Sequence, residues 1–207
     1  MSSLVNRRSV MTLYADAADP IGHAVRIVLA EKDVNVEVAF VTDETKPDDL
    51  HDYNPYHTLL TLIDRELVLY DAQIMLEYLD ERYPHPPLMP VDPVSRANNR
   101  QIRYRIARDL LAQTERLARD DAEAADARRT IGDNLHAIAP ALNHQPYFLS
   151  DEYTLVDCCF APLLWRLPHY GIKLTAQAKS LLRYADKLFA REAFRASLSA
   201  AERAMRS

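Results

Sequence analysis

The chain has 207 residues, 48% of them hydrophobic, and carries a formal net charge of -5 with an isoelectric point near 5.8. This length and apolar content are enough for one large domain or two small ones with a buried core. The acidic balance disfavours direct, sequence-specific binding to nucleic acid, because no broad positive field attracts phosphate backbones. No segment approaches the roughly 20 apolar residues that span a bilayer, so we expect a cytoplasmic protein without membrane contact.

The N-terminal part of the chain begins with a β-α-β pattern. A strand is predicted at Ser9 to Tyr14, and Asp19 followed by Pro20 supplies an N-cap and a first-turn proline for a helix over Ile21 to Lys32. Val34 to Val41 alternates apolar residues with others at period two, which is typical of a strand with one buried face.

The pattern continues with a hairpin and a third helix. Lys46 to Tyr53 is predicted to form a short irregular helix. Two compact apolar runs, Leu59 to Ile63 and Leu67 to Tyr70, fit an antiparallel hairpin. Asp71 to Tyr83 has helical spacing of its apolar residues. The predicted order is therefore β-α-β-α-β-β-α.

The stretch from Tyr83 to Pro93 contains five prolines. Proline removes a backbone donor and biases the preceding residue away from helix, so this stretch is predicted to be extended. It is the best domain boundary in the chain. We expect a thioredoxin-like N-terminal domain over residues 1–83, a proline-rich linker over 84–93 and an all-helical C-terminal domain over 94–207.

Helical patterns fill the remaining sequence, in a chain with only three glycines. Thr154 and Asp157 have the spacing of a capping box and open the most apolar helix. The other predicted helical segments are Val94 to Asp121, Ala122 to Ala139, Ala176 to Phe189 and Arg191 to Met205.

The two cysteines, Cys158 and Cys159, are adjacent in this apolar helix. Two neighbours cannot build a disulfide framework or a metal site, so we expect buried, reduced thiols with a structural role. The seven histidines are scattered through the sequence without a ligand spacing, and no metal or other cofactor is expected.

In its element order, linker and helical second part, the sequence resembles the cytosolic glutathione transferases over nearly its whole length. The strings that carry this resemblance are VRIVLAEKDV, LLTLIDRELVLYDAQIMLEYLDERYP and TLVDCCFAPLLWRL. Within that superfamily the sequence is similar to the stringent starvation protein A family, through RSVMTLY, HAVRIVLAEK, LEYLDERYPHPPLMPVDPVSR, PYFLSDEYTLVDC and APLLWRLP.

The transferase resemblance implies three requirements for glutathione chemistry, and the sequence departs from each. A Tyr, Ser or Cys after the first strand would activate the thiol, and Tyr14 is the only candidate, in a place that also suits packing. A cis-proline would stand where this chain has Leu60, before Thr61; we expect Leu60 to be trans. An acid and a serine would begin the third helix, where the chain has Asp71 and Ala72, and Asp71 also suits an N-cap.

The regulator resemblance points instead to the linker. Pro84, His85 and Pro86 hold side chains outward on a backbone of restricted conformation, which suits protein recognition. In the stringent starvation protein A family this surface is the implied determinant of action on transcription through RNA polymerase. The alternative is an interdomain spacer in which His85 is merely exposed. Catalysis by His85 lacks a neighbouring nucleophile.

Two groups of charges near the linker have alternative interpretations. One group either orients a partner or forms a solvated helix face; it comprises Asp80, Glu81 and Arg82. The other either pairs with acids, within the helical bundle or across a homodimer interface, or contacts acidic surfaces of polymerase or nucleic acid held by it. Its members are Arg96, Arg100, Arg103, Arg105 and Arg108.

We therefore expect a homodimeric adaptor that binds sigma-containing RNA polymerase holoenzyme, changes promoter choice under starvation or acid stress, and catalyses no reaction. One alternative is a glutathione-dependent transferase or reductase, which retention on immobilised glutathione and turnover of an electrophile would reveal. Another is a structural subunit that heterodimerises with a related paralogue, which would not form a stable homodimer alone.

Overall fold

A computed structural model of the chain describes residues 10–118 and 121–206. Ser9, included in the first predicted strand, and residues 119–120 of the predicted helix ending at Asp121 lie outside the described residues. Among the described residues, no helix combines the length and hydrophobicity that crossing a membrane requires.

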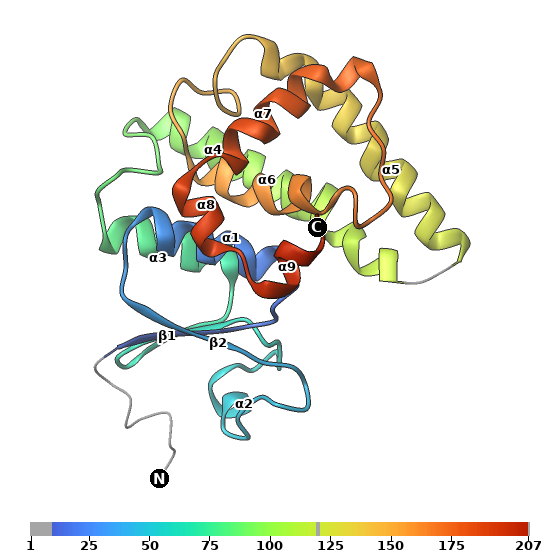
Figure 1. Cartoon of the computed structure of the whole chain (residues 1–207). Coiled ribbons are helices and arrows are strands. Elements are labelled where there is room, and N and C mark those ends of the chain that lie inside the picture. The colour runs from blue at the N-terminus through green and yellow to red at the C-terminus, as the bar shows by residue number, and fades with distance from the viewer. Residues whose placement is uncertain (1–9, 119–120, 207) are drawn as a thin grey trace.

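The N-terminal part has the predicted β-α-β-α-β-β-α order. Its elements are β1 (Met11–Ala15), α1 (Pro20–Glu31), β2 (Val36–Phe40), α2 (Leu50–Tyr53), β3 (Thr61–Asp64), β4 (Leu67–Leu69) and α3 (Ala72–Arg82). The strands form one sheet in the order β2-β1-β3-β4, with β1 and β2 parallel and the other pairs antiparallel. Helices α1 and α3 lie between this sheet and the C-terminal helices, and α2 lies on the opposite side of the sheet (Figure 1).

Strand β1 supplies both faces of this layered arrangement, because successive side chains of a strand alternate. Leu13 and Ala15 belong to the large core that the sheet shares with the helices. Tyr14 points the other way, into a small cluster with Val41 and Leu50 of α2.

Local capping explains where α1 begins. Asp19 is the N-cap, and its carboxylate accepts a hydrogen bond from the backbone N–H of Gly22 at 2.6 Å, while Pro20 is the first helical residue, as predicted. A Cβ atom on Gly22 would lie 3.1 Å from Cβ of Ala15, so the helix approaches β1 too closely for a larger residue to fit without a shift.

The C-terminal part is helical. Its α-helices are α4 (Pro93–Arg105), α5 (Ala122–Ile138), α6 (Leu155–Arg166), α7 (Lys179–Phe189), α8 (Glu192–Ser197) and α9 (Ala200–Ala204). Helix α6 runs through the centre of this part (Figure 1), where it packs against α1, α4 and α7, and almost all of its residues are buried. It begins with the predicted capping box of Thr154 and Asp157.

Two predicted C-terminal helices are wrong in extent. The helix expected over Val94 to Asp121 ends as α4 at Arg105 and continues as a π-helical turn over Ile106–Leu110 and a 3-10 helix over Leu111–Ala118. Ile106, Leu110 and Leu111 are buried in this region. The spacing of buried residues differs little among the α-, π- and 3-10-helical forms over one or two turns, so the apolar pattern did not predict where the α-helix ends.

The helix expected over Arg191 to Met205 is broken into α8 and α9. The backbone is extended at Leu198, and Ser199 caps α9 with a second capping box, in which Glu202 accepts from the Ser199 N–H. The Ser199 hydroxyl donates to the carbonyl of Ala17 at 2.7 Å, in the loop after β1. This tertiary contact favours a turn where spacing alone predicted a continuous helix.

The carboxylate of Glu202 lies at the junction between the two parts of the chain and is fully buried. Arg26 of α1 donates to both of its oxygens, at 2.7 and 3.0 Å. Arg166, at the end of α6, donates to the same carboxylate and to the carbonyl of Ala18. Three helices distant in sequence therefore meet at one anion.

His23 completes this cluster as a neutral group. Burial lowers its pKa well below the ordinary value, and the attraction of Glu202 does not offset that effect. Nδ1 lies 3.1 Å from the Arg166 guanidinium and Nε2 lies 2.9 Å from the Ser197 hydroxyl. A neutral ring that accepts at Nδ1 and donates at Nε2 satisfies both contacts.

We predict that Glu202→Gln destabilises the protein by about 3 kcal/mol, because Arg26 and Arg166 would remain buried without their counter-charge. Burial alone would raise the pKa of Glu202, but hydrogen bonds from Arg26 and the surrounding positive charge outweigh it and hold that pKa at about 2. A lowered carboxyl pKa stabilises the fold above the unfolded value and loses that effect as pH falls.

Urea unfolding of both proteins between pH 7 and pH 3 measures this prediction. The difference in free energy of unfolding should be largest above pH ~4.5 and shrink toward pH ~2. Glu192→Gln, on the exposed surface of α8, is the matched control. A Glu202→Gln effect as small as that of the control would contradict the role assigned to this carboxylate.

Candidate functional site

The residues predicted at the glutathione-like positions are mostly engaged in the fold. Tyr14 is 3% exposed and packs between the sheet and α2. The pairing of β1 with β3 places Tyr14 opposite Thr61, whose buried hydroxyl accepts from the Asn54 side chain at 3.3 Å. The structure thus brings these two together, with Tyr14 in a packing environment.

Leu60 has a trans peptide bond, as expected, since the only cis bond among the described residues joins His85 to Pro86. Its half-buried side chain packs against the large core. Its Cδ1 would lie 3.7 Å from a Cβ atom on Gly22, so it fills space beside the first turn of α1.

Asp71 and Ala72 stand at the start of α3. The Asp71 carboxylate accepts from the backbone N–H of Ile74 at 3.0 Å, which confirms the N-cap interpretation. Ala72 is the first helical residue and brings no hydroxyl group. At this helix start, the side chain of this chain's own Asp71 takes the place that a ligand carboxylate could occupy.

The loop between β1 and α1 is tied to the C-terminal helices, which the sequence analysis missed. Arg166 donates twice to the carbonyl of Ala18, at 3.0 and 2.9 Å, and Ser199 donates to that of Ala17. An arginine inside the apolar helix α6 was the available signal, because a buried charge requires partners. This loop is where a thiol-activating residue would stand.

Cys158 and Cys159 are buried and unbridged, as predicted. Burial raises the pKa of the Cys159 thiol to about 11 and that of Cys158 well above its ordinary value. The thiolate is the reactive form of cysteine, so neither side chain is a nucleophile near neutral pH.

The linker between α3 and α4 exposes its prolines and buries the residues that follow. Pro84, His85 and Pro86 are exposed, as is Pro87, whereas Leu88 and Met89 are 2% and 6% exposed. The predicted recognition residues therefore form a projecting segment whose far end is anchored in the core.

Lys32 and Asp80 hold this segment through buried contacts. Lys32, at the C-cap of α1, lies 2.6 Å from the Asp80 carboxylate and also donates to the carbonyl of Pro86. Asp80 accepts from the backbone N–H of Leu88 at 2.8 Å. Both side chains are buried. The interpretation of Asp80 as a surface charge that orients a partner is therefore wrong; it is a buried anchor of the linker.

Further contacts fix the linker toward α4. The carbonyl of Leu88 accepts from the N–H of Leu155 at 2.8 Å. Asp92 caps α4, and hydrogen bonds from Ser95 lower the pKa of its carboxyl group. The linker backbone is thus held at several points on both sides of its buried residues.

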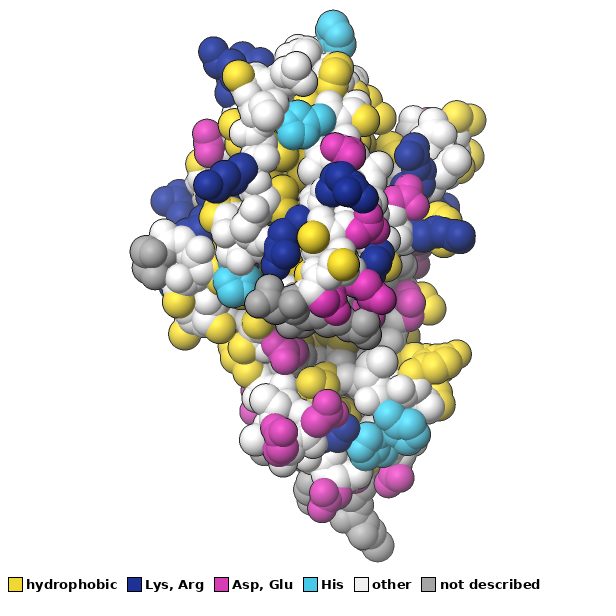
Figure 2. Space-filling model, turned by 90° about the vertical axis from the view of Figure 1, so that its right-hand side faces the viewer, with side chains coloured by type: hydrophobic (Ala, Val, Ile, Leu, Met, Phe, Trp, Pro, Cys, Tyr) yellow, Lys and Arg dark blue, Asp and Glu magenta, His cyan; other side chains and the backbone are white. Residues whose placement is uncertain are grey.

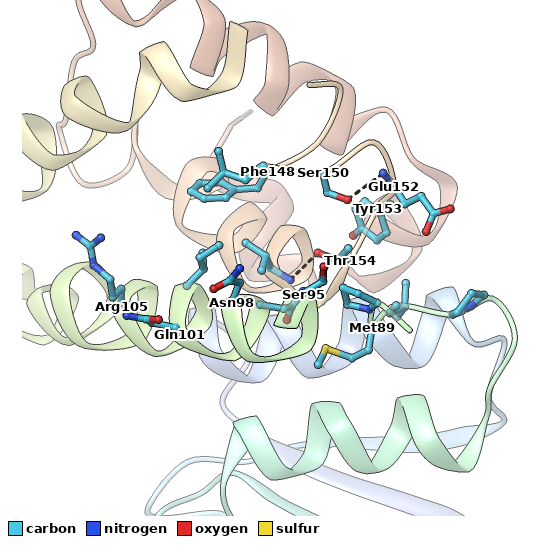
Figure 3. Close-up of a pocket in the computed structure, with 17 residues that line it drawn as sticks. Met89, Ser95, Asn98, Gln101, Arg105, Phe148, Ser150, Glu152, Tyr153 and Thr154 are labelled. Atoms are coloured by element: carbon cyan, nitrogen blue, oxygen red, sulfur yellow. Dashed lines mark hydrogen bonds between the residues drawn. The ribbon is translucent and has the colours of Figure 1, made fainter. Parts of the chain in front are cut away.

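A cavity of about 450 Å³ adjoins the linker (Figure 3). Met89 lies at one end, Ser95, Asn98, Gln101 and Arg105 follow along α4, and the segment from Phe148 to Thr154 forms the opposite wall. Asp157 organises that wall, since it accepts from the N–H groups of Phe148 and Thr154 at 3.0 and 2.7 Å. The cavity is therefore bounded by well-ordered backbone.

The arginines of α4 and of the turn that follows it form pairs within the molecule. This agrees with the first of the two interpretations of this basic stretch. Glu77 of α3 accepts from both Arg100 and Arg103, and hydrogen bonding to Arg100 is the main cause that lowers its pKa. The remaining pairs join Arg96 to Glu81 at 3.7 Å, Arg105 to Asp109 at 3.4 Å and Arg108 to the hydroxyl of Tyr104 at 2.7 Å. Arg82 lies 3.5 Å from Asp64. Most of these arginines therefore have an acidic partner within the molecule, whereas Arg108 bonds to a neutral hydroxyl.

Comparison with known proteins gives matches over almost the whole chain. Residues 13–87 match the glutathione S-transferase N-terminal domain, and residues 83–192 match the C-terminal domain. The stringent starvation protein A homologue of Pasteurella multocida (strain Pm70) is 46% identical over 96% of this chain and 94% of its own length. That of Coxiella burnetii is 45% identical over 97% of each. The structure is similar to a rice glutathione S-transferase solved with glutathione, with a TM-score of 0.84, 22% identity and 96% coverage of each chain.

We predict that Lys32→Met destabilises the protein by about 3 kcal/mol, because Asp80 would be left buried without its counter-charge. The backbone amide of Leu88 should also exchange faster with deuterium, because the Asp80 carboxylate that accepts from it would no longer be held by Lys32. Lys46→Met is the control: Lys46 pairs with the exposed Asp43, and its loss should cost at most about 0.5 kcal/mol. Equal effects of the two substitutions in urea unfolding would contradict the anchoring role.

Proposed function

Because this chain belongs to the glutathione S-transferase superfamily, and within it to the stringent starvation protein A family, we propose that it is a stress-response regulator that binds RNA polymerase holoenzyme. The polymerase would carry a sigma factor, and binding would change promoter choice in the cytoplasm under starvation or acid stress. The family resemblance supplies the partner.

The observation that carries this proposal is the exposed and anchored segment at Pro84, His85 and Pro86. Its backbone is fixed through Lys32 and Asp80, so little conformational entropy remains to be lost on binding. A projecting surface that is already ordered favours a role in protein recognition. A segment that served only as a spacer would need no buried ion pair to hold it.

The same proposal has the chain catalyse no reaction. Each departure from the glutathione-like site has a structural counterpart: Tyr14 is packed, Leu60 is trans and Asp71 caps its own helix. No thiol is available in place of Tyr14, because both cysteines are buried in α6. These features argue against the alternative of a glutathione-dependent transferase or reductase.

We predict that the purified chain retains RNA polymerase holoenzyme in a pull-down and that a Pro84→Ala, His85→Ala, Pro86→Ala variant loses at least tenfold of that retention. The thermal unfolding midpoint of the variant is measured beside that of wild type, so that retention is compared only between folded proteins. Purified components and immobilised wild-type or variant chain give the measurement directly.

A His144→Ala, Pro146→Ala variant is the matched control, since these residues form a second exposed histidine-proline segment, before α6. It should retain polymerase like wild type. Loss in both variants would indicate a general surface effect, and no retention by wild type would overturn the proposal.

We further propose that the regulator is a homodimer formed through α3 and α4. Ile74 on α3 and Val94 and Tyr104 on α4 are 56%, 70% and 57% exposed. Ion pairs from Glu77 to Arg100 and Arg103 join these two helices into one rigid surface. Exposed apolar side chains on such a surface suit a second copy of the chain.

The predicted result is a dimer by light scattering for wild type and a monomer for Val94→Glu, Tyr104→Glu at the same micromolar concentration, because two carboxylates in each copy would lose solvation in the interface. Leu182→Glu, at an exposed leucine of α7, is the control and should stay dimeric. A wild-type monomer would favour pairing with a related paralogue instead.

A further inference from the structure

Two histidines of the N-terminal part face each other at the surface. Nδ1 of His51 and Nδ1 of His57 lie 2.6 Å apart, with ring centroids separated by 4.6 Å and planes inclined at 61°. Figure 2 shows a pair of histidine side chains in contact on the lower part of the molecule, with acidic side chains around them. The partner-binding linker and the glutathione-like positions do not use this pair.

The loop that carries the pair is held by hydrogen bonds of Asn54. His51 belongs to α2, and Asn54, fully buried, follows that helix. The Asn54 side chain accepts from the N–H of Tyr56 at 3.0 Å and donates to the carbonyl and hydroxyl of Thr58 at 2.8 and 2.9 Å. His57 donates its own N–H to the carbonyl of Asn54 at 3.0 Å. The ring of His57 is therefore held opposite that of His51.

The backbone of His57 has φ of 56°, in the left-handed region. Residues other than glycine are uncommon there, although Asn, Asp and His occur several times more often than most. Histidine is thus one of the residues that suit this backbone conformation. At this position its Nδ1 lies beside Nδ1 of His51.

A neutral imidazole has one nitrogen lone pair that accepts a proton or a metal ion. The two Nδ1 atoms share one proton in a hydrogen bond, and loss of that proton leaves both lone pairs available to converge on one cation. Nitrogens about 2.0 Å from a metal lie about 2.8 Å apart at adjacent corners of a square plane and about 3.3 Å apart in a tetrahedron. The separation of 2.6 Å is that of an N–H···N hydrogen bond between the two rings, and small rotations of the side chains bring it to either value.

We propose that His51 and His57 form a two-nitrogen chelate for a divalent transition metal, Cu²⁺ or Ni²⁺. Imidazole suits both ions. Among residues 10–118 and 121–206, no group of three or more His, Cys, Asp or Glu side chains could hold a metal, so the protein supplies two ligands and solvent supplies the others. His57 is exposed and His51 half-buried, which leaves the remaining positions open to water.

The local charge also favours a cation. Asp48 and Asp52, on either side of His51 in the sequence, are both exposed. Exposed carboxylates close in sequence to the pair raise the local concentration of divalent ions without being ligands themselves.

The experiment titrates the untagged full-length chain with NiCl₂ in a non-coordinating buffer at pH 7.5, by isothermal calorimetry. We expect one Ni²⁺ per chain, and at least tenfold weaker binding for His51→Asn and for His57→Asn, because a single imidazole loses the intramolecular second contact. Asparagine is chosen at position 57 because it tolerates the left-handed backbone. Electron paramagnetic resonance with one equivalent of Cu²⁺ should show two coordinated nitrogens in wild type.

His144→Asn is the matched control, since His144 is an exposed histidine outside the pair, and it should bind Ni²⁺ like wild type. Unfolding midpoints of all variants establish that each one is folded before its affinity is compared. Binding by His51→Asn or His57→Asn with wild-type affinity would overturn the chelate, as would a wild type that takes up no stoichiometric metal.

Discussion

The buried carboxylate of Glu202 is the constraint on which the arrangement of the two parts depends. Taking a carboxylate and two guanidinium groups out of water costs several kcal/mol for each ion, and this cost is offset only where the geometry is good and other donors are satisfied. Here Arg26 binds both oxygens through its terminal nitrogens, while its buried Nε has no hydrogen-bond partner among the described residues. Arg166 also bridges to the loop after β1, and the N–H of Ser199 closes the capping box. Any other orientation of α9 would leave these charges unpaired.

Helix α1 carries this constraint to the linker. Arg26 in its middle contacts Glu202, and Lys32 at its end contacts Asp80 and the carbonyl of Pro86. A helix of this length is stiff, so the position of the C-terminal helices on α1 also determines where the linker projects. A second ion pair, between Arg191 and Glu31, holds the same end of α1 against α8 at 2.6 and 2.7 Å. The proposed recognition surface therefore rests on buried interactions far from it.

Sequence reasoning predicted the features whose causes are local. The caps at Asp19, Asp71 and Thr154 follow from residues within three or four positions, and the exposure of His85 follows from its flanking prolines. The Glu202 cluster could not be predicted in this way, because its partners Arg26 and Arg166 lie 176 and 36 residues away. The same holds for Asp80, which spacing placed on a solvated helix face and which Lys32 draws into the interior. The break before α9 did have a local signal, Ser199 followed by Glu202 three residues later.

These interactions also explain how the fold can persist while the glutathione-like positions diverge. The transferase requirements concern a hydroxyl or thiol after β1, a cis bond before β3 and a polar group at the start of α3. This chain fills the same places with Tyr14 packed on α2, Leu60 against the core and Asp71 as a cap, so each change is satisfied inside the fold. Arg166 and Ser199 further tie the loop after β1 to the second part of the chain. A loop tied in this way strengthens the junction that orients the linker, which is the surface where we place the function.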